Sequence, residues 1–340
     1  MPLQGVPEEI MRRLPIVLIA IAVLLLVSCG AKKTAADRVV ITAVNFPSYD
    51  AARAVAGDSA DIRMLLPPGA ESHTYEPTPD DIKRIMASDL FIYTGGESEA
   101  WVEYILKDLD DKVEVFSLME AVDSLLEEAE TIVPHDHDHE HDHDHEHEHE
   151  HEHDHDHEHE HEHEHELDEH VWTSPANEKR IISKLAATLA EIAPEHKDLY
   201  EKNAGEYIAE IEKLDQEFRS VVDGARTRTL VIADRFPILY FTTEYGLEVH
   251  AAFPGCAAET EANASTIAAL IDLVKSDGVK AILHMELSNT MLARTISEET
   301  GAKVLEFNSA HNVSKKDFDK GITWTQIMRG NVDVLKEALD

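Results

Sequence analysis

The chain has 340 residues, enough to bury one large hydrophobic core or two smaller ones. Its formal net charge is −38, and without the sixteen carboxylates of the segment from His135 to Glu166 it would still be about −22. An acidic surface of this kind repels nucleic acid and attracts cations, so we expect no nucleic-acid partner.

The first thirty residues have the pattern of an export signal. Arg12 and Arg13 precede an apolar run, Leu14–Val27, which is as long as the hydrophobic part of a signal peptide and short for a membrane span. Translation could start at Met1 or at Met11.

The apolar run ends in the sequence LVSC (26–29), which resembles a bacterial lipobox. The resemblance implies a lipoprotein signal peptide over residues 1–28, a lipidated Cys29 and an anchor linker over residues 29–37, on the outer face of the cell membrane. An ordinary signal peptide with a chance cysteine is the alternative. With Cys29 lipidated, Cys256 has no partner for an intramolecular disulfide.

The body of the chain alternates β-rich and helical segments, which is typical of α/β folds with mostly parallel sheets. In the first half these segments are Arg38–Val44, Ser48–Ala56, Asp61–Leu66, Thr78–Ser88, Leu90–Tyr93, Glu97–Leu106 and Val113–Phe116. In the second half they are Leu230–Ala233, Tyr240–Tyr245, Glu248–Phe253, Ser265–Ser276, Ala281–Met285, Met291–Thr300, Lys303–Phe307 and Trp324–Leu339. The pattern predicts two α/β lobes, over residues 38–190 and 225–340.

A long amphipathic helix is expected between the lobes, within residues 191–224. Its apolar residues recur at alternating steps of four and three, at Tyr200, Ala204, Tyr207, Ile211, Leu214, Phe218 and Val221. We expect this helix to pack on both lobes as a rigid rod in a monomer. A coiled-coil dimer seam is the alternative.

Candidate metal ligands follow the ends of the expected strands. Ligands of open α/β sheets bind beyond the carboxyl ends of the strands. The polar residues placed there are His73, Asp234, Arg235, Glu286 and His311, and His170 precedes a helical stretch that starts near Pro175. We therefore expect these side chains to gather at one edge of both lobes.

Each of these residues also has a purely structural interpretation. A single loop histidine is most often a solvated surface residue, as we expect for His196 and His250. Glu286 could hydrogen-bond a loop backbone, and Asp234 could pair with Arg235. Position alone therefore does not select the ligands.

Two motifs narrow the choice. The sequences PPGAESHTYEPTPD (67–80) and DEHVWTSP (168–175) resemble the two metal motifs in the first lobe of the solute-binding lipoproteins of zinc and manganese ABC importers. The similarity runs from about Val39 to the C-terminus. It implies two α/β lobes joined by one long helix, with the metal held between them and with His73 and His170 as the first two ligands.

The second lobe departs from the pattern of that family. The usual third ligand falls on Arg235, whose guanidinium cannot coordinate a cation, and the usual last aspartate falls near Asn308. The expected ligands are therefore His73, His170 and His311, with Asp234, Glu286 or water as the fourth. Three imidazoles and one oxygen favour tetrahedral Zn²⁺ over Mn²⁺, which prefers a harder shell, and leave nickel and copper open.

The segment from His135 to Glu166 alternates histidine with acidic residues throughout. Both faces of such a strand would be hydrophilic, so we expect a disordered loop within residues 133–167. Its H-E-x-x-H match at residues 147–151 is a trivial result of the alternation and does not indicate a protease. The loop would collect several zinc ions weakly beside His170; a dispensable low-complexity insertion is the alternative.

These expectations describe a lipid-anchored extracytoplasmic protein, not an enzyme, that captures Zn²⁺ in a cleft between lobes and delivers it to a membrane ABC permease. One alternative is a surface zinc buffer or adhesin that relies on the histidine-rich segment. The other is a zinc hydrolase, which would need an open coordination position and a placed general base.

Overall fold

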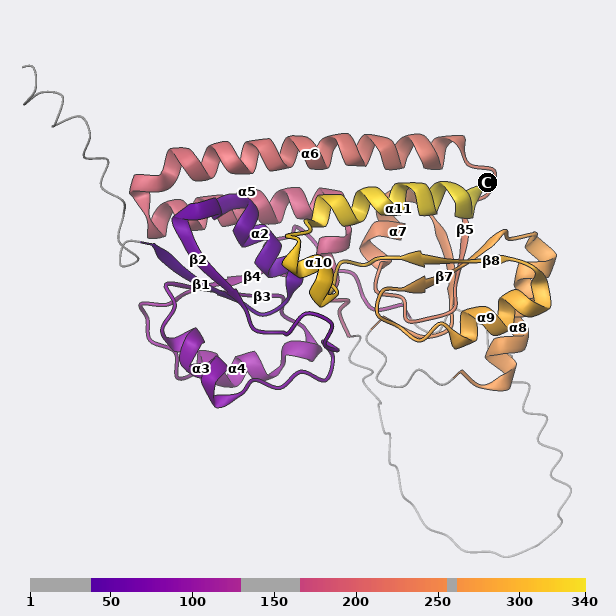
Figure 1. The fold of residues 1–340 in the computed structure, drawn as a ribbon, viewed down its shortest axis with the longest axis horizontal. Helices are drawn as coiled ribbons and strands as arrows, with labels where there is room; N and C mark the ends of the chain where they lie inside the picture. Colours follow the sequence, from indigo (N-terminus) through magenta and orange to yellow (C-terminus); the bar gives the residue numbers. More distant parts are fainter. Residues whose placement is uncertain (1–37, 130–165, 256–261) are drawn as a thin grey trace, which may run out of the picture. The chain divides into compact units, whose positions relative to one another are not determined.

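The computed structural model of the protein describes residues 38–129, 166–255 and 262–340. From Val39 to Asp340 these residues form one unit that contains two parallel four-stranded sheets (Figure 1). The expected signal peptide, Cys29, the anchor linker and nearly all of the histidine-rich segment lie outside the described residues. Among the described helices, none is long and apolar enough to cross a membrane.

The first lobe is built on a sheet with the strand order β2-β1-β3-β4. Its strands are β1 (Val39–Ala43), β2 (Ala60–Met64), β3 (Leu90–Tyr93) and β4 (Glu114–Ser117), and its crossover helices are α2 (Phe46–Ala56), α3 (Pro79–Met86) and α4 (Trp101–Leu106). Parallel pairing sets Val39 opposite Ala60 and Ile41 opposite Leu90. The carboxyl ends of all four strands therefore lie at one edge of the sheet.

The second lobe repeats this arrangement with the order β6-β5-β7-β8. Its strands are β5 (Thr229–Ile232), β6 (Glu248–Ala251), β7 (Ala281–Met285) and β8 (Lys303–Phe307). Its helices are α7 (Leu239–Tyr245), α8 (Ala264–Asp277), α9 (Met291–Thr300), α10 (Lys315–Asp319) and α11 (Trp324–Leu339). The expectation of two mostly parallel α/β lobes is confirmed.

Local sequence signals explain where these helices begin and end. Thr78 and Asp81 form a reciprocal capping box at the start of α3, as the sequence indicates. Helix α2 begins two residues before the expected start, because the Asn45 side chain accepts a hydrogen bond from the backbone N–H of Ser48. Gly301 ends α9 in the left-handed conformation at a φ of 76°.

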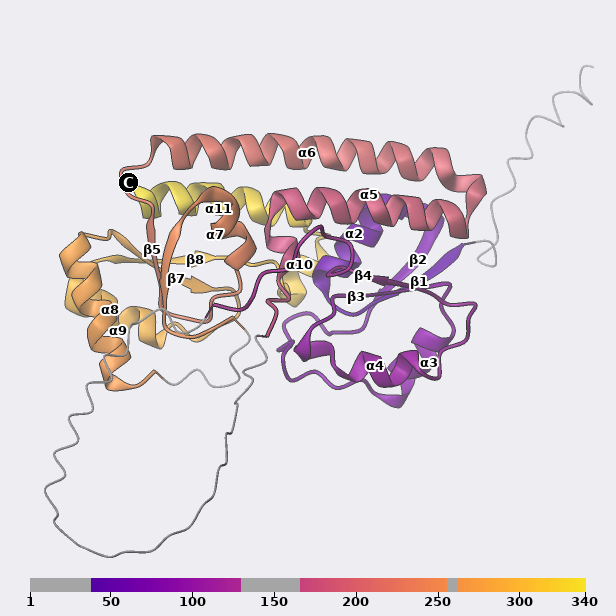
Figure 2. The same cartoon turned by 180° about the vertical axis from the view of Figure 1, so that it is seen from behind.

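A layer of long helices covers the same side of both sheets (Figures 1 and 2). Helix α5 (Pro175–Ile192) belongs to the first lobe, and α6 (Lys197–Gly224) spans about 42 Å at 1.5 Å per residue. Helix α6 packs on α2 and α5 of the first lobe and on α7 and α11 of the second. The expected rod is present. It begins at Lys197, because a 3₁₀ turn (Pro194–His196) separates it from α5.

The apolar stripe of α6 is the seam of one continuous core. Its buried members are Tyr200, Ala204, Tyr207, Ile211, Leu214, Phe218 and Val222, so Val222 takes the place expected for the half-buried Val221. Smaller cores lie under α3 and α4 in the first lobe and under α8 and α9 in the second. Because the largest core runs through both lobes, α6 holds the two sheets together.

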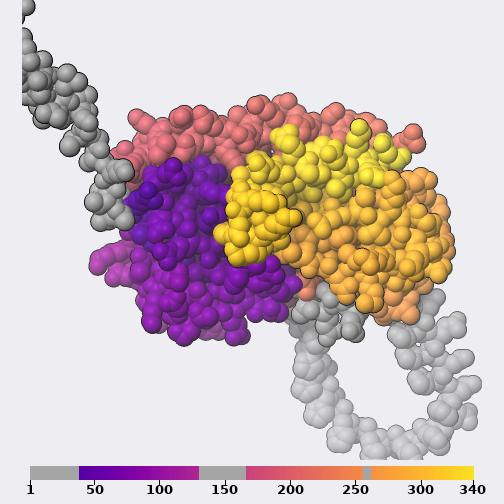
Figure 3. Space-filling view, viewed as in Figure 1, coloured from indigo at the N-terminus to yellow at the C-terminus, as the bar shows by residue number. Residues whose placement is uncertain are grey.

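The chain that follows β8 crosses back to the first lobe before it enters α11. The ring of Phe318 lies 5.2 Å from that of Tyr49 in α2, and Asp50 Oδ2 accepts the backbone N–H of Trp324 at 2.7 Å. Figure 3 shows this part of the chain, around α10, seated against the first lobe. The segment between β8 and α11 is therefore held against α2 of the first lobe.

Candidate metal centre

The strand ends bring the candidate ligands to neighbouring loops. His73 lies in the loop that follows β2, and His311 lies in the loop that follows β8. His170 comes from a third segment, where it directly precedes a 3₁₀ turn (Val171–Thr173) that leads into α5. The three histidines are far apart in the sequence, and the fold brings them together.

The three imidazole rings of His73, His170 and His311 form one cluster. Their ring centroids are separated by 5.3 to 5.9 Å, and one nitrogen of each ring can be chosen so that all three lie within 4.8 Å of one another. Nitrogens bound to one tetrahedral zinc ion are about 3.4 Å apart, so a small contraction would complete the geometry. Among the described residues this is the one group of metal-binding side chains with such spacing.

His170 is fully buried, and neither of its ring nitrogens has a hydrogen-bond partner among the described residues. Its Nδ1 lies 3.3 Å from Asp168 Oδ1, close enough for an ion pair but without hydrogen-bond geometry. The same oxygen accepts the backbone N–H of His170 at 2.8 Å. A buried imidazole with unused nitrogens is costly unless something binds it, and a metal ion would do so.

His73 also has a buried carboxylate beside it. Glu169 Oε1 lies 3.7 Å from His73 Nδ1 and accepts a hydrogen bond from Ser98 Oγ at 2.6 Å. A Cβ at Gly96 would come within 2.6 to 2.8 Å of the Glu169 side chain, so the close approach needs glycine there, as does the φ of 85°. Carboxylates behind metal-binding histidines fix the orientation of the ring and raise its basicity.

His311 belongs to the second lobe by chain connection but is fastened to the first. Asn312 Nδ2 donates hydrogen bonds to the carbonyl oxygens of Pro67 and Ala70, at 3.0 and 2.8 Å. Ser72 Oγ lies 3.3 Å from His311 Nδ1. These contacts tie the loop of His311 to the loop of His73.

Burial and neighbouring charges keep two of the imidazoles neutral. Burial, followed by the charges of His170 and Arg235, lowers the pKa of His73 to about 4. Burial, followed by the charges of His170, His73 and Arg235, holds the pKa of His311 well below its ordinary range. Burial alone would also lower the pKa of His170, but the Asp168 and Glu169 carboxylates raise it. Two of the three rings are therefore ready to bind a cation without losing a proton.

The two carboxylates named as candidates for the fourth ligand are engaged with backbone groups. Asp234 accepts the N–H groups of Arg235 and Met285, at 2.8 and 3.0 Å. Glu286 accepts both the N–H and the hydroxyl of Ser309, each at 2.7 Å, and the N–H of His311 at 3.1 Å. Neither belongs to the group with metal-binding spacing, and both hold loops in place.

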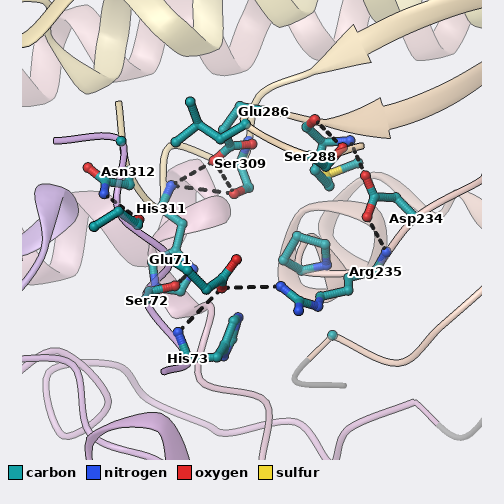
Figure 4. A pocket seen from close by; sticks show the side chains of 16 residues that line it. Glu71, Ser72, His73, Asp234, Arg235, Glu286, Ser288, Ser309, His311 and Asn312 are labelled. Carbon is teal, nitrogen blue, oxygen red and sulfur yellow. Dashed lines mark hydrogen bonds and ion pairs between the residues drawn. The ribbon is translucent and has the colours of Figure 1, made fainter. Parts of the chain in front are cut away.

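Arg235 lines the same pocket as His73 and His311. Its Nη1 lies 3.2 Å from Glu71 Oε1, which belongs to the loop of His73 (Figure 4). Its expected pairing with Asp234 is limited to the backbone N–H. With His73 and His311, Arg235 and Glu71 line a pocket of about 180 Å³, whereas the fully buried His170 does not reach its surface.

The stem of the histidine-rich segment joins the site directly. This stem consists of the residues that precede and follow the segment, which are hydrogen-bonded to each other. Glu128 N donates to Glu166 O at 2.7 Å, and Asp168 N donates to Leu126 O at 2.9 Å. Tyr240 of α7 closes this stem, since its hydroxyl accepts the N–H of Leu126 at 3.0 Å and donates to the carbonyl of Asp168 at 2.9 Å. The segment therefore ends four residues before His170.

The other described histidines lie outside the cluster. His196 packs against Tyr200 with ring centroids 5.9 Å apart, and His250 pairs with Glu248 at 3.4 Å; both are partly buried rather than fully solvated. The third, His284 on β7, is buried, and its Nδ1 lies 2.9 Å from the carbonyl oxygen of Met285. Sequence reasoning did not single out Asp168, Glu169 or Glu71 as members of the site. All three lie within the two quoted motifs, and an acidic residue close to a motif histidine was the available signal.

Comparison with known proteins gives a consistent assignment. Residues 40–338 match the sequence profile of the family described as "ZnuA: Zinc-uptake complex component A periplasmic". The chain is 32% identical over 327 residues to the high-affinity zinc uptake system protein ZnuA of Bacillus subtilis, covering 94% of this chain and 96% of that protein.

Two further similarities come from Streptococcus pneumoniae. The chain is 29% identical to the zinc-binding lipoprotein AdcA over 334 residues, 97% of this chain, but spans 62% of the length of AdcA. The crystal structure of the Zn(II)-bound ZnuA-like domain of AdcA superposes with a TM-score of 0.70 at 26% identity, covering 89% of this chain and 99% of that domain. The chain therefore belongs to the zinc-uptake complex component A family, the metal-binding solute-binding proteins of zinc ABC uptake systems, which are transport proteins and not enzymes.

Proposed function

We propose that this protein binds one Zn²⁺ ion tightly between its lobes, through His73, His170 and His311, and delivers it to a membrane ABC permease. The ion is the transported substrate and not a resident cofactor. The observation that carries the proposal is the three-imidazole cluster, in which His170 has two unused ring nitrogens at full burial. Three imidazoles suit the borderline-soft Zn²⁺ and do not suit Mn²⁺, which prefers oxygen ligands.

We further propose that the protein acts as a monomer anchored by lipidated Cys29 on the outer face of the cell membrane. In the sequence the support is the apolar run that ends at Cys29. Under this proposal the first lobe covers residues 38–190, the connecting segment residues 191–224 and the second lobe residues 225–340. Labelling with a radioactive fatty acid, with Cys29→Ala as control, tests the anchor.

The histidine-rich segment is proposed to collect zinc for this site. Its stem closes next to His170, so ions held by the segment would be released close to the cluster. Each of its histidine and carboxylate pairs is a weak ligand by itself, and the sixteen histidines together raise the local zinc concentration.

Zinc titration calorimetry tests both roles. The compared proteins are the full chain, a variant without residues 135–165, a His73→Ala/His170→Ala variant, and a matched His196→Ala/His250→Ala control. We expect one tight equivalent in the full chain, the deletion variant and the control, and none in the cluster variant. We also expect the weak, multiple binding to disappear with the deletion. Loss of the tight equivalent on deletion would show that the segment, and not the cluster, is the principal site.

A further inference from the structure

The loop that carries His311 is held by side chains along its length. Each backbone N–H of residues 308–311 donates a hydrogen bond to a side-chain oxygen. Asn331 of α11 accepts the first at 3.0 Å, and the Asn308 side chain accepts the third at 2.8 Å. Glu286, which directly follows β7, accepts the second and the fourth, at 2.7 and 3.1 Å. Because N–H groups outside regular secondary structure need such partners, the shape of this loop depends on the side chains around it.

Two residues at the contact between Glu286 and this loop have an unusual backbone conformation. Ala310, within the loop, has a φ of 58° and is fully buried, and Leu287, next to Glu286, has a φ of 59°. Among the described residues, these are the only two besides glycines with a positive φ. A residue with a side chain keeps this conformation only where its surroundings enforce it. The surrounding hydrogen bonds therefore hold the loop in a shape that it would not adopt by itself.

This held shape places the His311 ring in the cluster. Its centroid lies 5.3 Å from that of His73 and 5.3 Å from that of His170. Glu286 does not belong to the group with metal-binding spacing. Figure 4 shows its side chain beside Ser309, on the opposite side of the pocket from His73. Glu286 is therefore joined to the site through the backbone of the His311 loop.

We propose that Glu286 is a positioning residue for zinc binding, which holds the His311 imidazole in place before the ion arrives. The inference rests on the proposed three-histidine site. Three hydrogen bonds from Ser309 and His311 engage both oxygens of the carboxylate. A glutamine has a single acceptor oxygen and could not hold both N–H groups. A ligand that is already in place loses less conformational freedom when the ion binds, so the affinity is higher.

Chelator-competition titration of zinc in the full chain tests this role with Glu286→Gln. We expect zinc binding to weaken about tenfold, as is usual when a group that orients a metal ligand is lost. The matched control is Asp81→Asn, because the Asp81 carboxylate accepts the N–H and the hydroxyl of Thr78, at 2.9 and 2.7 Å, at the start of α3 and outside the pocket. The control should keep its zinc affinity within about twofold.

Hydrogen exchange of the backbone amides of residues 308–311 supplies a second readout, which does not depend on affinity. In the metal-free unaltered protein these amides should already be protected, and zinc should add little protection. In metal-free Glu286→Gln they should exchange at least about tenfold faster, and zinc should restore part of the protection. The Asp81→Asn control should leave these amides unchanged.

Unchanged zinc affinity in Glu286→Gln would overturn the proposal. Weaker binding with unchanged exchange of residues 308–311 would also overturn it, because Glu286 would then act on zinc in another way. Thermal unfolding of the metal-free proteins checks that each variant folds.

Ser309→Ala is a milder variant for use if Glu286→Gln does not fold, since it removes the hydroxyl that donates to Glu286 at 2.7 Å. It should change both readouts in the same direction, with zinc binding weakened about two- to threefold. In that case, an unchanged affinity or unchanged exchange in Ser309→Ala would overturn the proposal.

These outcomes are distinguishable from failure of the three-histidine site. If His311→Ala retains tight zinc binding, the proposed site and this inference both fail. If His311→Ala loses tight binding while Glu286→Gln keeps it, the three-histidine site stands and only the role of Glu286 is overturned.

Discussion

The two lobes contribute to the cluster in different ways. In the first lobe, His73 and His170 each have a buried carboxylate next to an imidazole nitrogen, Glu169 and Asp168 respectively. In the second lobe, the carboxylates Asp234 and Glu286 bind backbone N–H groups, and only His311 joins the cluster.

The loop of His311, the one ring that the second lobe contributes, is hydrogen-bonded to the first lobe. Asn312 bridges to the loop that precedes His73, and the Trp172 indole N–H donates to the carbonyl of Ser309 at 2.9 Å. The difference between the lobes shows that a site between domains can be built almost entirely on one of them.

His170→Ala should abolish tight zinc binding, with an affinity loss of more than about 100-fold, because it removes a ligand and leaves a buried hole. His250→Ala is the matched control, since His250 lies on β6 outside the cluster. Chelator competition measures the affinity, and thermal unfolding of the metal-free proteins checks that both variants fold. Tight binding by the His170→Ala variant would remove His170 from the site.

Asp168→Asn should weaken zinc binding about 10- to 100-fold, because the negative charge that supports the His170 imidazole is lost. The shape of the side chain is kept, so the unfolding temperature should change less than the affinity. The same competition assay measures the effect. An affinity equal to that of the unaltered protein would mean that the carboxylate has only a structural role.

Zinc affinity should fall about tenfold per pH unit once the pH drops below the raised pKa of His170, because a proton and the metal compete for one imidazole. His73, with a pKa lowered to about 4, and His311, whose pKa burial holds well below its ordinary range, stay neutral over this range and add no dependence. Affinity measured from pH 8 to pH 5 should therefore show the loss of binding to one proton. A dependence on three protons centred near pH 6.5 would contradict this account.

Asp234→Asn should have the smallest effect on zinc, less than about threefold, because Asp234 does not belong to the cluster and acts on the backbone. Its removal should instead lower the free energy of unfolding by about 1–3 kcal/mol, since an amide group cannot accept both N–H groups equally well. Denaturant unfolding and zinc competition together separate the two effects. A large loss of zinc affinity with unchanged stability would make Asp234 a ligand.

The sequence predicts the fold because the signals for it are local. Strand periodicity, the Thr78 capping box and the apolar stripe of α6 each depend on residues close in the chain. The same holds for His73 and His170, which lie in contiguous motifs. The boundaries near Lys197 and Asn45 differ from expectation because a 3₁₀ turn and a side-chain cap decide them.

The second-lobe part of the site depends on long-range contacts that no local pattern reveals. The proximity of Arg235 to Glu71, and of Asn312 to Pro67, joins residues about 164 and 245 positions apart. The engagement of Asp234 with the N–H of Met285 likewise follows from the pairing of β5 with β7. The sequence identifies Asp234 and Glu286 as candidate ligands. Only the packed structure shows that their carboxylates accept hydrogen bonds from backbone N–H groups.

The most direct test of the three-histidine site is zinc X-ray absorption spectroscopy of the variant without residues 135–165, loaded with one equivalent of zinc. The account predicts multiple-scattering features of three imidazoles at about 2.0–2.1 Å, with one oxygen neighbour. His311→Ala should reduce the number of imidazoles to two. A spectrum dominated by oxygen, or one with fewer than three imidazoles in the otherwise unaltered variant, would contradict the assignment of His73, His170 and His311.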